Sequence, residues 1–223
     1  TRKESSAASD VYKRQACTPG PSCCCWCSST MPWAWWPTAG WATEFIGIIL
    51  HVRHSSPYPM RITKYIHSCL LFELNGRQLL FDPGKFSFTE GLVQPDVFKD
   101  VATVIITHDH PDHLDVDALQ RIVEQSGAII ISNGEVAAKL KQQGLAVQIH
   151  EEGPLDRGAF QLQALPVRHE AILDSPLPQM TAWLVNGRVL NPADSFAENL
   201  LQFAGVELLI LPVTAPCLLY TSD

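Results

Sequence analysis

The hydrophobic positions of this chain follow a regular strand and helix pattern from residue 60 onward. Apolar runs at 69–74 and 77–82 flank the dipeptide Asn75-Gly76. Asn-Gly readily adopts the two positive-φ conformations of a type I′ turn, so the segment is predicted to be a β-hairpin. Asp82-Pro83-Gly84 is expected to end its second strand.

Strands and helices alternate after this hairpin. The β-branched run at 101–107 predicts a buried strand. Helical spacing of apolar residues from Val116 to Val123 predicts a helix that ends at Gly127. The remaining predicted elements are strands at 128–132, 145–149, 160–167 and 206–213, a helix at 134–143, and a second hairpin turning at Asn186-Gly187. This order predicts a mixed α/β domain with functional loops at strand ends.

Both ends of the chain differ from this pattern. Residues 10–15 are encoded by GAT GTG TAT AAG AGA CAG, which resembles a transposon-end sequencing adapter, and one frame of its reverse complement encodes residues 217–222. We therefore expect residues 1–59 to be non-native and disordered, made of adapter and translated upstream DNA. We expect a domain at 60–216 that is incomplete at its C-terminus, and an adapter-derived tail at 217–223.

The alternative for the N-terminal segment is native structure or a membrane anchor. Its longest apolar stretch, residues 45–50, is much shorter than the roughly 18 residues that a membrane span needs. Five of the seven cysteines crowd between Cys17 and Cys27, without the second Cys-x-x-Cys pair that a structural zinc site would use. Cys69 is interpreted as a small buried apolar residue.

Length and charge narrow the function classes. The 223 residues are 46% hydrophobic, which is sufficient for one domain with a core. The net charge of −7 disfavours a nucleic-acid partner, because binding phosphates requires a basic surface. We expect a small-molecule substrate, no nucleic-acid or membrane partner and a cytoplasmic location, and the sequence is compatible with a homo-oligomer.

The candidate chemistry lies in the run Thr107-His108-Asp109-His110-Pro111-Asp112-His113. Four metal-ligand candidates fall within six positions: His108, His110, Asp112 and His113. Neutral imidazole and carboxylate bind zinc, iron and manganese, and a catalytic site leaves one position open for water. Two histidines at a spacing of two can reach one metal while Asp112 and His113 reach another, which favours two cations. The alternative is a solvated turn with surface histidines.

This run resembles the HxHxDH motif of the metallo-β-lactamase-fold hydrolases. Residues 60–86 are similar to the opening of those proteins, in which a buried early aspartate supports the metal loop. Residues 166–169 and 191–196 also fall in the expected order, so the resemblance covers nearly all of residues 60–216. It implies an αββα sandwich, and the nearest branch is that of the ascorbate-phosphate lactonase-like proteins.

The resemblance also implies a set of ligands. His108, His110 and His169 would bind the first metal, Asp112 and His113 the second, and Asp194 would bridge both. On the residues alone, His169 could equally be a polar strand cap and Asp194 a turn residue or helix N-cap.

Two departures from the family pattern affect this set. Ala193 stands where the family usually has glycine. The family's last metal-binding histidine would follow residues 206–213, where this chain has adapter-like residues, which implies a truncated domain with an incomplete second site. His150 is the other histidine near the middle of the domain that could replace this ligand, but it does not stand at the family's position for it in the sequence.

Several neighbouring residues are given structural interpretations. Asp109, Asp115 and Glu170 are interpreted as solvated acidic loop residues, with a role as hydrogen-bond partners of the ligands as the alternative. His67 is interpreted as a satisfied histidine at the end of a strand, with a position in the cleft as the alternative.

We expect a metal-dependent hydrolase that uses metal-bound hydroxide on a small ester, lactone or phosphoester. Zinc is the expected cofactor, as one or two ions, with iron or manganese as alternatives. Asp112 would orient the hydroxide and is the predicted catalytic residue. The alternatives are a metal-binding domain without turnover in this truncated form, and a nuclease or phosphodiesterase of the same superfamily.

Overall fold

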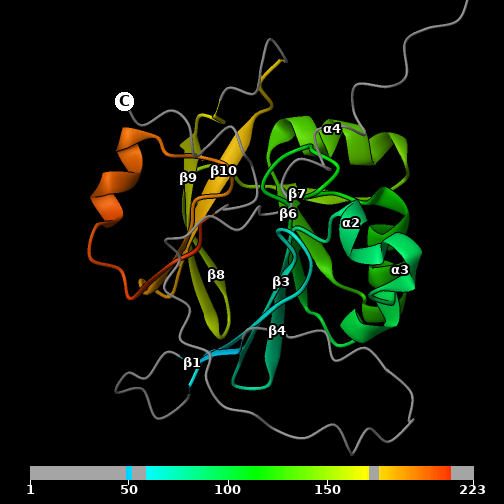
Figure 1. The fold of residues 1–223 in the computed structure, drawn as a ribbon. Helices are drawn as coiled ribbons and strands as arrows, with labels where there is room; N and C mark the ends of the chain where they lie inside the picture. The colour runs from blue at the N-terminus through cyan, green and yellow to red at the C-terminus, as the bar shows by residue number, and fades with distance from the viewer. Residues whose placement is uncertain (1–48, 52–58, 171–175, 212–223) are drawn as a thin grey trace, which may run out of the picture. The chain divides into compact units, whose positions relative to one another are not determined.

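The computed structural model of the protein describes residues 49–51, 59–170 and 176–211. The predictions made for residues 1–48, for 52–58 and for the tail at 217–223 lie outside the described residues. Within the described part, two β-sheets pack face to face and helices cover the outer faces (Figure 1).

The first sheet has seven strands in sequential order. Strands β1 to β4 are antiparallel, whereas β4 to β7 are parallel. Their bounds are β1 Ile49–His51, β2 Arg61–Lys64, β3 Leu70–Leu74, β4 Arg77–Phe81, β5 Thr103–Ile105, β6 Ile129–Ser132 and β7 Val147–Ile149.

The second sheet has five strands in the order β12-β11-β10-β9-β8. Strands β8 to β11 are antiparallel, and β12 pairs with β11 in parallel. Their bounds are β8 Gly153–Arg157, β9 Phe160–Val167, β10 Met180–Val185, β11 Val189–Asn191 and β12 Leu208–Leu209.

Three apolar clusters hold these layers together. Between the sheets, Phe72, Phe81 and Trp183 are fully buried in one core. On the outer face of the first sheet, Leu119 and Ile122 of a helix pack in a second core. The helical elements are α2 Lys85–Phe88, η2 Thr89–Gly91, η3 Pro95–Phe98, α3 Val116–Ser126, α4 Gly134–Gln142 and η4 Glu198–Phe203.

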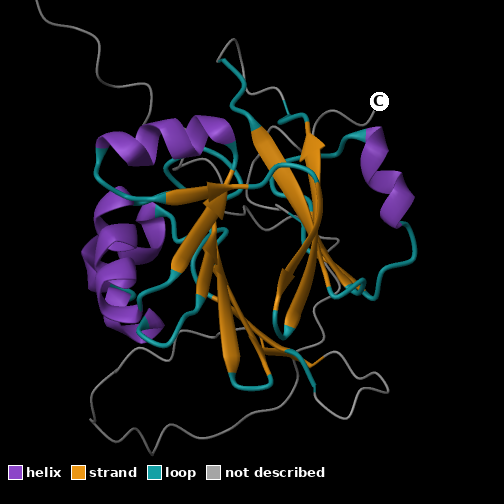
Figure 2. Ribbon diagram, turned by 180° about the vertical axis from the view of Figure 1, so that it is seen from behind, coloured by secondary structure: helices purple, strands orange, loops and turns teal. Residues whose placement is uncertain are grey.

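The third, smaller cluster lies on the outer face of the second sheet, where Leu200 of η4 packs beside Val167 and Met180. The layer order is therefore helices, sheet, sheet, helix, which confirms the predicted αββα sandwich (Figure 2). None of the helices in the described residues is both long enough and apolar enough to span a membrane.

The local signals in the sequence explain most of these elements. Both Asn-Gly turns have positive φ at each residue, 51° and 71° at Asn75-Gly76 and 52° and 65° at Asn186-Gly187, as the hairpin predictions require. Helix α3 begins at its N-cap Asp115, whose side chain accepts a hydrogen bond from the Ala118 amide, and ends at Gly127.

One predicted strand differs in extent, and two strands were not predicted. Of the predicted strand at 206–213, the described residues 206–211 form only the two-residue strand β12. Strand β8 was not predicted, because Gly153 and Pro154 depress its β-propensity. Strand β1 was not predicted either; it pairs with β2 through backbone groups that need no side-chain pattern, and the non-native origin of residues 1–59 stays a prediction.

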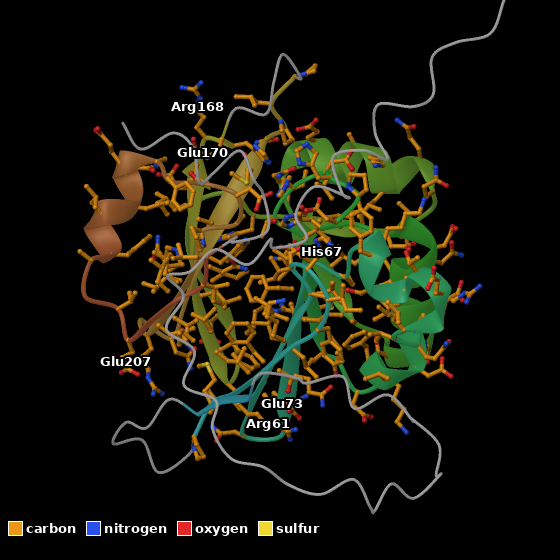
Figure 3. All side chains as sticks on the ribbon, viewed as in Figure 1. Arg61, His67, Glu73, Arg168, Glu170 and Glu207 are labelled. Carbon is orange, nitrogen blue, oxygen red and sulfur yellow. The ribbon has the colours of Figure 1, made fainter. Side chains whose placement is uncertain are left out.

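The strand directions place several loops at one end of the molecule. Strands β4, β5 and β6 are mutually parallel, so their carboxyl ends meet at one edge of the first sheet. Strands β9 and β11 both run antiparallel to β10, so their carboxyl ends also share an edge. Figure 3 shows Arg168 and Glu170, just beyond β9, at the opposite end from the Arg61–Glu73 ion pair, whose atoms are 3.4 Å apart.

Gly127 provides a test of the account of helix α3. Its φ of 68° lies in the left-handed region, where an added Cβ has open space but an unfavourable backbone conformation. Gly127→Ala is expected to lower the free energy of unfolding by about 1 kcal/mol. Urea denaturation measures this, and an unchanged or increased stability would contradict the left-handed C-cap.

Candidate metal centre

The predicted histidine run forms a loop directly after β5. Thr107 and His108 are fully buried, and His113 is 2% exposed at the other end of the run. His169 follows the end of β9, and Asp194 follows the end of β11. The two shared strand edges therefore bring the run, His169 and Asp194 together.

The first group of side chains consists of His108, His110, His169 and Asp194, with one donor atom from each within 4.8 Å of all the others. His108 Nε2 lies 3.1 Å from His110 Nδ1 and 3.7 Å from Asp194 Oδ2. His169 Nε2 lies 3.6 Å from the same carboxylate oxygen. These four residues are the predicted first ligand set together with the predicted bridge.

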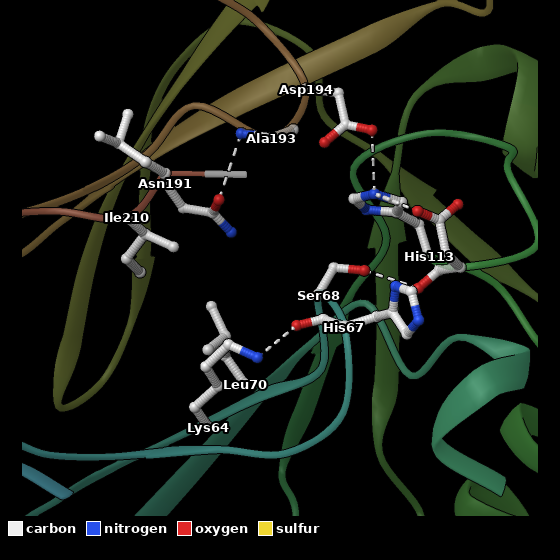
Figure 4. A pocket seen from close by; sticks show the side chains of 11 residues that line it. Lys64, His67, Ser68, Leu70, His113, Asn191, Ala193, Asp194 and Ile210 are labelled. Atoms are coloured by element: carbon white, nitrogen blue, oxygen red, sulfur yellow. Dashed lines mark hydrogen bonds and ion pairs between the residues drawn. The ribbon is translucent and has the colours of Figure 1, made fainter. Parts of the chain in front are cut away.

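The second group consists of Asp112, His113 and Asp194. His113 Nε2 lies 3.3 Å from Asp194 Oδ2 and 3.6 Å from Asp112 Oδ2. Asp194 thus belongs to both groups, as predicted. Figure 4 shows Asp194 and His113 facing each other from the two sheets. All six predicted site residues are brought together, and their role as metal ligands remains a prediction.

The electrostatics of the first group favour neutral imidazoles at His108 and His110. Burial and the neighbouring imidazoles hold the pKa of His108 well below its usual value, and they lower the pKa of His110 as well. Burial opposes ionisation of Asp194, but the adjacent His113 and His169 imidazoles hold the pKa of this carboxyl well below its usual range. The neighbouring Asp194 carboxylate outweighs burial at His169 and raises the pKa of that imidazole. His108 and His110 therefore offer imidazole lone pairs beside a carboxylate.

One atom tests directly whether a cation fits this group. His169 Nε2 is buried and has no hydrogen-bond partner among the residues that the structure describes. The ring orientation is fixed from the other side, where His169 Nδ1 lies 2.6 Å from the Glu170 carbonyl oxygen and donates to it. A buried nitrogen without a partner is unfavourable, and a cation satisfies it. The donor set of the site therefore fits a metal ion.

Asp82 supports both ends of the histidine loop. Its carboxylate accepts hydrogen bonds from the Thr107 amide at 2.7 Å, from the Thr107 hydroxyl at 2.9 Å and from His113 Nδ1 at 3.0 Å. Because Nδ1 of His113 donates to Asp82, Nε2 is the nitrogen that faces Asp112 and Asp194. Asp82 itself is held at a φ of 46°. This arrangement matches the supporting aspartate that the resemblance implied.

Gly84 lets the Asp82 loop approach the histidine loop closely. A Cβ at this position would lie 1.8 Å from the carbonyl oxygen of Asp112. The same carbonyl accepts a hydrogen bond of 2.6 Å from the Ser68 hydroxyl, and the Lys85 amide donates to the Pro111 carbonyl at 2.7 Å. These contacts fix the backbone that carries Asp112.

Asn133 is a supporting residue that the sequence reasoning missed. It follows β6 and is fully buried, and its side-chain nitrogen donates to the carbonyl oxygens of Thr107 at 3.2 Å and Gln179 at 2.7 Å. Its side-chain oxygen accepts from the Val136 amide at 3.0 Å and thereby caps α4. One side chain thus connects the histidine loop, α4 and the segment before β10. A lone Asn before a helix signals the cap, but the sequence gives no sign of the two longer-range contacts.

The neighbouring acidic residues differ in their roles. Asp109 forms an ion pair with Lys139, and Asp115 caps α3. The interpretation of Glu170 as a solvated loop residue is wrong, because Glu170 forms hydrogen bonds within the protein. Its carboxylate accepts from the Phe196 amide at 2.9 Å, and its amide donates to the Asp194 carbonyl at 3.0 Å. It therefore supports the loop that carries Asp194.

The interpretation of His67 is also wrong. It lies in the turn between β2 and β3 at a φ of 53°, and its ring stacks on Phe86 with centroids 4.5 Å apart. His150 lies outside both groups, where Nε2 is 3.2 Å from the Gly153 carbonyl oxygen.

Asp82→Asn tests the support of His113. The substitution keeps the size of the side chain but removes the charge that fixes Nδ1–H of His113. Zinc affinity is expected to fall about ten- to a hundredfold, measured by competition with a chromogenic chelator. Asp156→Asn, at an exposed position of β8, is the matched control and should bind zinc as the wild type does. If the wild type, Asp82→Asn and Asp156→Asn bind zinc with equal affinity, Asp82 does not support His113 as a ligand.

Asn133→Asp separates the two roles of Asn133. The aspartate can still cap α4, but it loses the nitrogen that donates to Thr107 and Gln179. The variant is expected to keep its helix content by circular dichroism and to bind zinc about tenfold more weakly. Asn133→Ala loses the cap as well, which costs about a further 1 kcal/mol of stability. If Asn133→Asp binds zinc normally, Asn133 is only a helix cap.

The His113 environment predicts a pH dependence of the metal-free protein. Burial lowers the pKa of His113, but the charges of Asp82 and Asp194 outweigh it and raise this pKa to about 10. The folded state then holds a proton that the unfolded state loses near pH 6.5, so the stability that this proton contributes declines as pH rises toward 10. With chelator present, the free energy of unfolding is expected to fall between about pH 7 and 8.5. His113→Gln should flatten this slope, and a wild-type stability that rises over the same range would contradict the assignment.

Comparison with known proteins agrees with this fold. The family model of the β-lactamase superfamily domain matches residues 61–223. Protein Rv0786c of Mycobacterium tuberculosis is 32% identical over 165 residues, which are 70% of this chain and 73% of that protein.

A UPF0173 metal-dependent hydrolase of Chelativorans sp. is 36% identical over 89 residues. The match covers 39% of this chain and 36% of that relative. Among solved structures, Igni18, a metallo hydrolase of Ignicoccus hospitalis, superposes with a TM-score of 0.50 and 26% identity, covering 66% of this chain and 65% of that one. From the αββα fold, the match over residues 61–223 and these relatives, the chain belongs to the β-lactamase superfamily of metallo-β-lactamase-fold hydrolases.

Proposed function

We propose that this protein is a metal-dependent hydrolase whose clustered histidines and aspartates hold one or two divalent cations. The single observation that carries the proposal is the sharing of Asp194 by two ligand groups. The Chelativorans relative, a metal-dependent hydrolase by name, supports it. Zinc is our first candidate because imidazole and carboxylate suit it, and iron or manganese would accept the same donors.

The two groups are expected to differ in affinity. The first offers three imidazoles and a carboxylate, whereas the second offers one imidazole and two carboxylates including the shared one. Four donors hold a cation more firmly than three, so we expect the first group to fill at lower metal concentration. A bound cation would polarise a substrate oxygen and lower the pKa of a water molecule toward neutrality.

Asp112 is the proposed catalytic residue. Its side chain is 33% exposed, in contrast to the 3% of His113 beside it. Its backbone is fixed by Ser68, so the carboxylate has a defined position at the edge of the cluster. From there it can accept a proton from water that attacks a substrate, and orient that water.

The proposed substrate is a small ester, lactone or phosphoester. The cavity next to the second group has a volume of about 80 Å³, which suits a compact molecule or one group of a larger one. The net charge of −7 supports a small molecule over a nucleic acid as substrate.

The test combines metal content with turnover. Purified protein is loaded with zinc, and metal per chain is measured by mass spectrometry alongside hydrolysis of nitrophenyl acetate, a γ-lactone and bis(nitrophenyl) phosphate. We expect at least one zinc per chain and turnover of one substrate class. Both should be lost in His108→Ala and retained in His150→Ala, a histidine variant outside the cluster.

The outcomes separate the alternatives. Fewer than one zinc per chain in the wild type would overturn the ligand assignment. Full zinc binding without hydrolysis of any substrate would mean that the protein binds metal without turnover. Hydrolysis of the phosphodiester alone would assign it to the phosphodiesterases.

A further inference from the structure

A small cavity opens beside the second ligand group, with Asp112, His113 and Asp194 in its wall. The rest of the wall brings together polar groups and apolar side chains from both sheets (Figure 4). The residues that matter for the inference are Lys64, Ser68, Leu70, Asn191 and Ile210. A substrate that reaches Asp112 would place its neighbouring atoms in this cavity.

Asn191 presents a hydrogen-bond donor to this cavity. The residue is only 4% exposed, and its side-chain oxygen accepts from the Ala193 amide at 3.2 Å, which fixes the carboxamide. No described residue accepts a hydrogen bond from its side-chain nitrogen. Figure 4 shows this nitrogen directed toward the space between Asn191 and Ser68. A buried amide that leaves one end available is suited to bind an oxygen atom of a ligand.

Lys64 presents a positive charge to the same cavity. Its ammonium donates to the carbonyl oxygens of Tyr65 at 3.1 Å and His67 at 2.9 Å, which leaves one of its three protons for another acceptor. Among the residues that the structure describes, it is the single lysine or arginine in the cavity wall, and no carboxylate forms an ion pair with it. The two backbone contacts hold the charge in place without neutralising it.

From these two groups we propose that the cavity binds an anionic oxygen group of the substrate, a carboxylate or phosphate, between Asn191 and Lys64. The inference rests on the proposed function and adds a substrate class to it: a small acid whose scissile bond lies toward Asp112 and Asp194. A charge-assisted hydrogen bond from the ammonium and a neutral one from the amide satisfy two oxygens of such a group. Leu70 and Ile210 would contact its carbon atoms.

The kinetic test compares two esters that differ by one carboxylate. Zinc-loaded protein is assayed with nitrophenyl acetate and with the nitrophenyl monoester of succinic acid. The ratio of kcat/KM for the succinate ester to that for the acetate is expected to fall at least about tenfold in Lys64→Met and in Asn191→Asp. The aspartate introduced by the second substitution would keep the acceptor for the Ala193 amide and would replace the donor with a negative charge. Lys99→Met, an exposed lysine outside the cavity, should leave the ratio unchanged.

A binding test gives an answer that does not depend on turnover. In ¹⁵N-labelled zinc-loaded protein, succinate or inorganic phosphate is titrated while the side-chain amide signal of Asn191 is followed by NMR. A saturable shift with either ion, weakened in Lys64→Met, supports the proposal, and the ion that shifts it at lower concentration identifies the carboxylate or the phosphate class.

The failures of the two proposals are distinguishable. If the zinc-loaded protein hydrolyses neither ester, nor the γ-lactone or bis(nitrophenyl) phosphate, the proposed function fails, while the titration still decides whether the cavity binds anions. If neither ion shifts the Asn191 signal, or if both esters lose activity equally in the two variants, the anionic subsite is overturned.

Discussion

The buried carboxylate of Asp82 is the contact on which the arrangement of the centre depends. A carboxylate that is 1% exposed is tolerated only where donors satisfy it, and here the donors are Thr107 and His113. These residues stand at the two ends of the histidine loop, so one side chain fixes both. The close contact of Gly84 with the Asp112 backbone, and the positive φ of Asp82, are the local costs of bringing the two loops together.

The rest of the centre depends on packing between the sheets. His108, His110, Asp112 and His113 follow a strand of the first sheet, whereas His169 and Asp194 follow strands of the second. The apolar core around Trp183 sets the separation of the sheets, and Asn133 connects them directly beside the histidine loop. Three carboxylates and four imidazoles then lie close together. Cations that neutralise this concentration of carboxylates would stabilise the folded state.

Much of the fold was predictable because the signals are local. Asn75-Gly76, Asn186-Gly187 and the Gly127 cap each act through backbone conformation, and the structure has the predicted turns and helix end. Strand β8 and the 3-10 helices lacked such signals. The short β12 depends on pairing with β11, which is a tertiary contact that no local pattern reveals.

The metal centre was only partly predictable from the residues alone. The density of ligand types in residues 108–113 was visible directly, whereas His169 and Asp194 could be placed only through the order of motifs in a resembling family. The contacts of Asn133 and Glu170 join residues far apart in sequence, and the contact of Asn191 lies within its own loop. Asparagine and glutamate are common in loops, so nothing in the sequence singled these residues out. Ala193 shows why glycine is usual there: it has a φ of 52°, and the buried contacts of its side chain with the cluster around Val167 offset part of that strain.

The central claim is that two ligand groups around Asp194 bind cations. Crystals grown with zinc, measured with anomalous diffraction at the zinc absorption edge, test it most directly. The account predicts an anomalous peak among His108, His110 and His169, and a second, weaker one beside Asp112 and His113. A peak located only elsewhere, for example at His150, would contradict it.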